Sequence, residues 1–170
     1  MAGYGLPKEQ HLSTVLQNSL ELEGHNIKII NGSVSGGTTA GGLNIAEWTL
    51  SENNIDFMIL CLGANDMLRG INPKETKNNL DEIIKIAQNK KIKVIIAGMI
   101  APTSYGFDYK KSFDKIFEDL SEKHKLQLIP FLLEGVAQKP ELNLSDGMHP
   151  NDKGTIVISK TLKKAILNNL

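Results

Sequence analysis

The stretch Phe57–Asp66, with the sequence FMILCLGAND, joins an apolar run to a polar segment bounded by glycine. Phe57–Leu62 does not alternate between apolar and polar residues, which is typical of a strand covered on both faces in a parallel sheet. Gly63-Ala64-Asn65-Asp66 follows at once. In open parallel sheets, ligand-binding groups gather beyond the carboxyl ends of the strands. This junction therefore predicts a fold class and a first position for a site.

Outward from this junction, three further short runs are rich in β-branched or aromatic residues. They are Ile27–Asn31, Lys93–Gly98 and Gln127–Phe131. None alternates cleanly, so each is predicted to be a strand buried in the same parallel sheet.

Segments with helical spacing of apolar residues precede or separate these runs, and Gly24 is expected to end the first of them. The predicted helices are Lys8–Glu23, Thr39–Leu50, a helix capped by Asn72 with Pro73 at its first position, Asp108–His124 and Asn151–Leu170. Strands that alternate with helices predict an α/β fold, here a three-layer α/β/α sandwich formed by residues 1–170 as a single domain. A fold of this kind opens with a strand, whereas this chain opens with a glycine-rich turn and a helix, so we expect the first strand to be absent.

The composition argues against several classes of partner. The chain of 170 residues has 19 basic and 19 acidic side chains, so no net charge attracts nucleic acid or anionic lipid. A single cysteine, Cys61, excludes a disulfide within the chain. No apolar stretch approaches the roughly 20 residues that span a bilayer, so no stable membrane insertion is expected. The N-terminus does not have the pattern of a signal peptide, which predicts a cytoplasmic protein for the chain as given.

Two polar segments follow predicted strands. Gly32–Thr39 is rich in glycine, and a backbone N–H from such a loop can stabilise an oxyanion. A flexible turn explains the same residues equally simply. The side-chain amide of Asn65 is a second donor suited to developing negative charge. G-x-N-D is also a common turn or helix-cap sequence.

A third polar segment, Asp146–Asn151, lies near the C-terminus and has the sequence DGMHPN. Asp146 and His149 are three residues apart in a loop bounded by glycine and proline. The carboxylate can accept from one imidazole nitrogen and leave the other free as a general base. The alternative is a loop histidine beside a capping aspartate.

Together and in this order, the three segments resemble the later conserved blocks of the SGNH (GDSL-type) hydrolases. The likeness is greatest to the bacterial acyl hydrolases with thioesterase, arylesterase and lysophospholipase activities. It extends over Asn65–Gly70, Ala101–Gly106 and Asp146–Asn151. The resemblance implies the SGNH fold with its flavodoxin-like sheet.

The resemblance also implies roles for individual residues. Gly36 and Asn65 would form the oxyanion hole, through a backbone N–H and a side-chain amide. His149 would be the general base and Asp146 its orienting partner. Substrate-binding residues would be Leu68, Ile100, Ala101, Pro102 and Tyr105. The family needs no metal and no cofactor, and its substrates are small or lipid-like acyl esters.

The first block of the family, Gly-Asp-Ser-Leu, is not found in these residues. The segment Ala2–Pro7 resembles the continuation of that block and would place the nucleophilic serine two positions before Met1. We therefore expect Met1 to be an internal methionine of a longer reading frame, in which an export signal could also lie. Neither Ser33, Ser35 nor Cys61 is expected to replace the serine.

The leading hypothesis is a hydrolase of carboxylic esters or thioesters that works through an acyl-serine intermediate in the complete protein. A second hypothesis is a truncated or degenerate member without catalysis, which at most binds acyl ligands. A third is a flavodoxin-like nucleotide or response-regulator module, which should show a phosphate-binding loop or an acidic cluster after its first strand.

Overall fold

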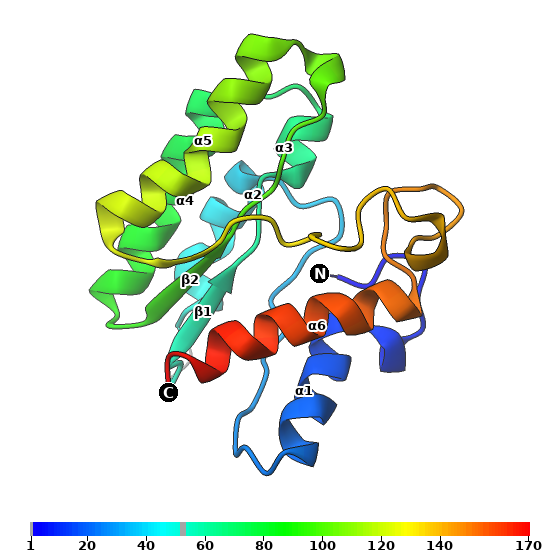
Figure 1. Cartoon of the computed structure of the whole chain (residues 1–170). Helices are drawn as coiled ribbons and strands as arrows, with labels where there is room; N and C mark the ends of the chain where they lie inside the picture. Colours follow the sequence, from blue (N-terminus) through cyan, green and yellow to red (C-terminus); the bar gives the residue numbers. More distant parts are fainter. Residues whose placement is uncertain (1, 52–53) are drawn as a thin grey trace. The chain divides into compact units, whose positions relative to one another are not determined.

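The computed structural model describes residues 2–51 and 54–170, which fall into two compact units (Figure 1). One unit is Gly36–Phe131 and the other combines Met1–Ser35 with Leu132–Leu170.

The Gly36–Phe131 unit contains a parallel sheet of three strands in the order β1-β2-β3. The strands are β1 (Phe57–Leu60), β2 (Lys93–Ala97) and β3 (Gln127–Ile129). The central strand β2 is almost entirely buried after its first residue, because it has a neighbour on each side. The sequence prediction of three buried parallel strands here is confirmed. Each strand is shorter than predicted, and Pro130 after β3 has no N–H with which to continue the ladder.

The helices of this unit are α2 (Thr39–Thr49), α3 (Ala64–Leu68), α4 (Pro73–Asn89) and α5 (Phe107–His124), with a 3-10 turn at Thr103–Tyr105. The Asn72 side chain caps α4 by accepting from the N–H of Lys74 at 2.9 Å, as its position before proline predicted. In Figure 1, α4 and α5 lie side by side. Their apolar faces form the centre of the core, with Leu80, Ile84, Ala87, Phe113, Ile116 and Leu120 all fully or almost fully buried.

The short helix α3 is not among the helices predicted from the sequence, where Gly63–Asp66 has either an oxyanion donor at Asn65 or a turn or helix cap. Gly63 precedes it with φ 112°, a conformation that side chains rarely adopt, and so turns the chain sharply after the strand region. The turn places Asn65 and Asp66 in the first turn of a helix, and thereby fixes the direction of both side chains.

The other unit contains α1 (Leu12–Leu22) and α6 (Asp152–Leu167), with 3-10 turns at Lys8–Gln10 and Pro140–Leu142. The α1 and α6 helices pack together, and Lys163 Nζ of α6 donates to Ser19 Oγ at 2.9 Å and forms an ion pair with Glu23. The predicted helix Lys8–Glu23 is divided at His11, whose backbone is extended. Gly24 has φ 80° just beyond the end of α1, as predicted.

The prediction of a strand at Ile27–Asn31 is wrong, because none of these residues pairs with a neighbouring strand. Instead the Gln17 side chain of α1 donates to the carbonyl of Ile27 at 2.7 Å and accepts from the N–H of Ile29 at 2.6 Å. The side-chain amide of Gln17 therefore makes the two hydrogen bonds that these backbone groups would make to a neighbouring strand in a sheet. A β-rich composition makes a strand only where a partner strand lies alongside.

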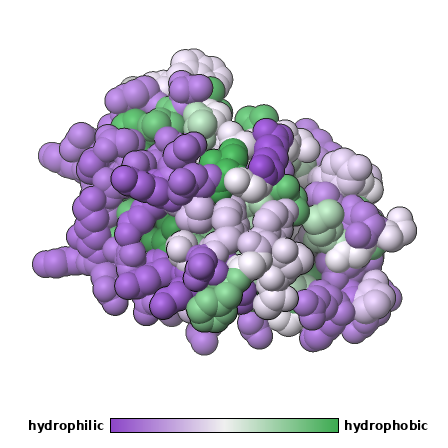
Figure 2. Space-filling view, turned by 90° about the horizontal axis from the view of Figure 1, so that it is seen from above, coloured by the Kyte–Doolittle hydropathy of each residue, from purple (hydrophilic) through white to green (hydrophobic). Residues whose placement is uncertain are grey.

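Hydrophilic side chains predominate on the face shown in Figure 2, with hydrophobic ones in small groups between them. Within residues 2–51 and 54–170, no helix has the length and apolar character needed to cross a membrane.

Asp81 on α4 is the charged junction between α4 and α5. Its carboxylate accepts from Lys123 at 2.7 Å, from His124 Nε2 at 2.6 Å and from Lys85 at 2.8 Å. Burial acts to raise the pKa of Asp81, but the hydrogen bonds from Lys123, Lys85 and His124 outweigh it and hold the pKa well below its usual range.

We predict that Asp81→Asn lowers the free energy of unfolding by about 1.5–3 kcal/mol at pH 7, because three charge-assisted hydrogen bonds are weakened. A carboxyl group whose pKa is lowered in the folded state stabilises that state at pH values above its unfolded-state pKa. The difference in free energy of unfolding between the two proteins should therefore narrow as the pH falls below about 4. Urea denaturation at several pH values measures this.

The matched control is Glu82→Gln, which removes an exposed ion pair with Lys85 on the same helix. We expect that change to lower the free energy of unfolding far less than Asp81→Asn does, because water screens an exposed pair. If both substitutions lowered the free energy of unfolding equally, the proposed importance of Asp81 as the charged junction between α4 and α5 would be wrong.

Candidate active site

Asp146 and His149 form a hydrogen-bonded pair in the loop before α6. Asp146 Oδ2 accepts from His149 Nδ1 at 2.7 Å. The other carboxylate oxygen accepts from the backbone N–H of Met148 at 2.8 Å and of His149 at 2.9 Å. Gly147, with φ 69°, allows the chain to turn back so that both amides face the carboxylate.

This geometry determines which imidazole nitrogen can act as a base. Backbone hydrogen bonds from His149 and Met148, followed by the side-chain hydrogen bond from His149, lower the pKa of Asp146 to about 2. An ionised carboxylate only accepts, so Nδ1 must carry a hydrogen. In the neutral imidazole, the lone pair is then on Nε2.

The loop itself is held by two asparagines that the sequence analysis did not single out as site residues. The buried Asn143 donates through Nδ2 to the carbonyls of Val136 and Lys139, both at 2.8 Å. Asn151 caps α6 by accepting from the N–H of Gly154 at 3.0 Å, and its amide donates to the carbonyls of Glu141 and Asn143. Because both ends of the Asp146–His149 segment are anchored, the pair is held on a rigid support. Only the capping role of Asn151 had a local signal, its position before a helix.

Gly36 and Asn65 are brought together in the Gly36–Phe131 unit. The Asn65 amide donates to the carbonyl of Gly37 at 3.1 Å, which uses one of its two hydrogens. Arg69 Nη2 donates to the carbonyl of Gly36 at 3.0 Å, and Gly36 has φ 69°. Arg69 is the only arginine among the 170 residues, and sequence reasoning gave it no role.

The Asp66 carboxyl group, next to Asn65, is fully buried and forms no ion pair with residues 2–51 or 54–170. It accepts from the backbone N–H of Thr39 at 2.8 Å, from the Thr39 hydroxyl through a short hydrogen bond, and from the Thr76 hydroxyl at 3.4 Å. Asn79 in turn donates to Thr39 Oγ1 at 3.0 Å. The network ties the first residue of α2 to α3 and α4, and so sets the distance between the glycine loop and Asn65.

The loop predicted to line the acyl pocket is anchored through its backbone. The N–H of Ala101 donates to Asp114 Oδ1 at 2.8 Å, and Lys110 Nζ donates to the Ala101 carbonyl at 2.8 Å. The Ala101 side chain is only 1% exposed and lies in the core, so it is not free to meet a ligand. Ile100, Pro102, Tyr105 and Leu68 all lie at the surface, and the Tyr105 hydroxyl donates to the Leu68 carbonyl at 3.2 Å.

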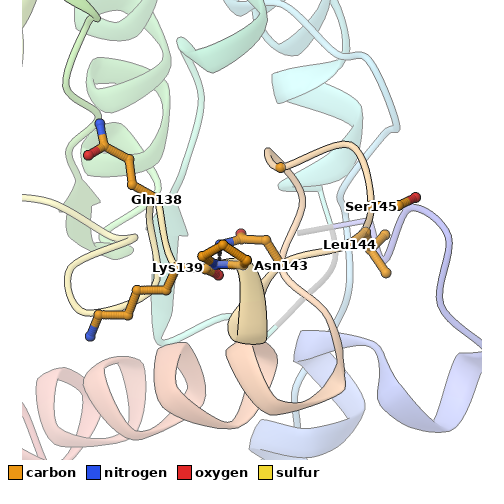
Figure 3. Close-up of a pocket in the computed structure, with 7 residues that line it drawn as sticks. Gln138, Lys139, Asn143, Leu144 and Ser145 are labelled. Atoms are coloured by element: carbon orange, nitrogen blue, oxygen red, sulfur yellow. Dashed lines mark hydrogen bonds between the residues drawn. The ribbon is translucent and has the colours of Figure 1, made fainter.

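A pocket of about 430 Å³ lies beside the Asp146–His149 loop and is lined by Gln138, Lys139, Pro140, Asn143, Leu144, Ser145 and Gly147. In Figure 3 the Gln138 and Lys139 side chains point away from Ser145. Ligand sites need convergent polar groups, and here they diverge, so we assign no ligand to this pocket. In the part of the chain that the structure describes, no three His, Cys, Asp or Glu side chains are grouped so as to hold a metal ion.

A sequence profile of the GDSL-like lipase/acylhydrolase family matches residues 1–155. The chain belongs to this family. An arylesterase of Vibrio mimicus is 34% identical over 169 residues, which are 99% of this chain and 84% of that protein. Esterase TesA of Pseudomonas aeruginosa is 34% identical over 149 residues, which are 88% of this chain and 74% of that protein.

Solved structures agree with the family assignment. A crystal structure of TesA matches with a TM-score of 0.93 and 31% identity, covering 99% of this chain and 94% of that one. The SGNH-hydrolase family esterase AlinE4 matches with a TM-score of 0.82 and 38% identity, covering 99% and 90%. The prediction of a three-layer α/β/α fold of the SGNH type is confirmed by these likenesses. Family and relatives identify a hydrolase of ester bonds, as predicted, and favour it over the non-catalytic and the flavodoxin-like hypotheses.

We predict that the Asp146 carboxyl titrates near pH 2, because two backbone amides and the imidazole stabilise its charged form. The carboxyl carbon signal in NMR, recorded from pH 1.5 to 6, measures the midpoint. Since the pKa is lowered in the folded state, the carboxylate stabilises the loop above the unfolded pKa of about 3.9, and this contribution is lost as the pH falls towards 2. A midpoint near 4 would show that the loop is not formed as described.

Proposed function

We propose that His149 is the general base of a serine esterase, that Asp146 orients it, and that Gly36 and Asn65 provide the oxyanion hole. The observation that carries the proposal is the hydrogen bond of 2.7 Å between His149 Nδ1 and an ionised Asp146, which leaves Nε2 as the acceptor. This is the arrangement that a histidine base requires.

The proposed reaction assigns each proton. Nε2 of His149 takes the proton of a serine hydroxyl as the serine oxygen attacks the acyl carbonyl, and Asp146 stabilises the resulting imidazolium. The free N–H of the Asn65 amide and the backbone N–H of Gly36 donate to the oxyanion. Nε2 then returns the proton to the departing alcohol or thiol, and a water molecule repeats the sequence on the acyl-serine. The serine is the one that the family resemblance places two positions before Met1.

The proposed substrates are carboxylic esters or thioesters with an apolar acyl group. Four surface residues of the Gly36–Phe131 unit support this, because Leu68, Ile100, Pro102 and Tyr105 offer apolar surface near one loop. Ala101 would support that loop from the core. We also propose, as the sequence predicts, that residues 1–170 act as one hydrolase domain.

The test compares the 170-residue chain with a chain extended upstream in the same reading frame to include a Gly-Asp-Ser-Leu segment. We expect only the extended chain to hydrolyse p-nitrophenyl butyrate and to be labelled by a fluorophosphonate. Hydrolysis by the 170-residue chain that is lost in His149→Ala would mean that another nucleophile serves the site. An extended chain that folds but neither reacts nor takes the label would favour the non-catalytic alternative.

In the active chain, we predict that Asn65→Ala lowers kcat by about 10²–10³-fold, because one oxyanion donor is removed. His149→Ala should lower kcat at least as much, because the base is lost. Asn44→Ala is the matched control, since Asn44 is an exposed asparagine of the same unit, on α2. Steady-state kinetics measure all three, and an Asn65→Ala enzyme as active as Asn44→Ala would exclude Asn65 from the hole.

Arg69 offers a second kinetic test, because its hydrogen bond to the Gly36 carbonyl holds the residue whose N–H is proposed to donate to the oxyanion. We predict that Arg69→Met lowers kcat about threefold to tenfold, while KM stays within about twofold. Lys74→Met, which removes an exposed cation of the same unit, should change neither constant. A change in KM alone would mean that Arg69 binds substrate and does not position the hole.

A further inference from the structure

The Tyr4 ring lies against the imidazole of His149, within the same unit. Their ring centroids are 4.4 Å apart and the planes are inclined by 33°. His149 therefore has a carboxylate on its Nδ1 edge and an aromatic ring on one face. The proposed mechanism uses the carboxylate and gives no role to the ring.

The turn that carries Tyr4 is held independently of that contact. Gly3 and Gly5 have φ 75° and 71°, and the N–H of Leu6 donates to the Gly3 carbonyl at 3.1 Å. His11 Nε2 donates to the Leu6 carbonyl at 3.0 Å. The shape of the turn therefore does not depend on the contact between Tyr4 and His149.

The same turn also approaches the loop that carries His149. A Cβ added to Gly5 would lie 2.8 Å from the side chain of Leu144, two residues before Asp146. A Cβ added to Gly3 would clash with the His11 ring. Both glycines also have a positive φ, which other residues rarely adopt, so the turn keeps its shape close to His11 and to Leu144.

The contact is not part of a buried core. Tyr4 is 59% exposed, and the side chain of His149 is 43% exposed. A contact between two exposed rings contributes less to folding than a buried one, because it removes less apolar surface from water. The contact acts instead on the orientation of the imidazole. The hydrogen bond to Asp146 fixes the position of Nδ1 but leaves the plane of the imidazole ring free to tilt. Contact with a second ring limits that tilt, and so fixes the direction of Nε2.

The ring also favours the charged state of the base. When Nε2 takes up a proton, the imidazole becomes a cation, and an aromatic face attracts a cation placed over it. The attraction is stronger when the proton has been transferred than before, so it favours the transition state over the ground state.

We propose that Tyr4 is a positioning residue for the general base, which holds the plane of His149 and stabilises its protonated form through the ring face. The proposal rests on the function proposed above for His149. The phenol hydroxyl takes no part, so phenylalanine should replace tyrosine at this position.

The contact is tested first by NMR on the 170-residue chain, which requires no activity. The carbon-bound ring protons of His149 should carry a ring-current shift that Tyr4→Leu removes and Tyr4→Phe retains. Trp48→Leu, which removes another exposed aromatic side chain, is the control and should leave these signals unchanged. His149→Ala identifies the signals among those of the four histidines. Signals that Tyr4→Leu does not move would overturn the contact.

Kinetics of the active chain test the consequence. Leucine keeps an apolar cover but has no aromatic face, so Tyr4→Leu should lower kcat about threefold to tenfold with KM within about twofold. Tyr4→Phe should keep kcat within about twofold of the unchanged enzyme. Unchanged kcat in Tyr4→Leu, or an equal loss in Tyr4→Phe, would overturn the positioning role. If instead His149→Ala retains full activity, the proposed function fails, and the NMR result still decides whether the rings are in contact.

Discussion

The buried carboxylate of Asp66 is the interaction on which the Gly36–Phe131 unit depends. Burying a carboxyl group is costly unless hydrogen bonds replace those it made to water. Here the Thr39 backbone and the hydroxyls of Thr39 and Thr76 supply those bonds. They come from α2 and α4, so the carboxylate joins both to its own helix α3. Any change in the separation of these helices would leave the buried carboxyl group without its hydrogen-bond partners.

The Asp66 network explains how the half-buried side chain of its neighbour Asn65 is held in place. Asn65 precedes Asp66 in α3, and the glycine loop before α2 ends at Thr39. The positions of Asn65 and Gly36 are therefore set by a core contact, with hydrogen bonds from Asn65 to Gly37 and from Arg69 to Gly36 completing the link. The oxyanion donor pair that we propose needs this preorganisation, because donors that must move during the reaction stabilise the developing charge less.

The Asp146–His149 loop reaches a similar order in a different way. Its carboxylate is partly exposed, and it is surrounded by donors from its own loop, while Asn143 and Asn151 anchor the two ends. Such a loop assembles from contacts that are close in sequence. The Tyr4 turn is the exception, since it reaches His149 from the other end of the chain.

The sequence by itself determined the three parallel strands, the capped helices and the Asp146–His149 pair, because each depends on local spacing or on backbone preference. It also indicated the family, through ordered blocks that the profile match over residues 1–155 confirms. Only the tertiary structure decided the partners of Asp66, Arg69, Asn143 and Tyr4, and the burial of Ala101. It also decided that Ile27–Asn31 forms no strand. Most of these outcomes depend on groups brought together from distant parts of the chain. A local sequence pattern does not specify which hydrogen-bond donor or which strand will lie next to a given residue.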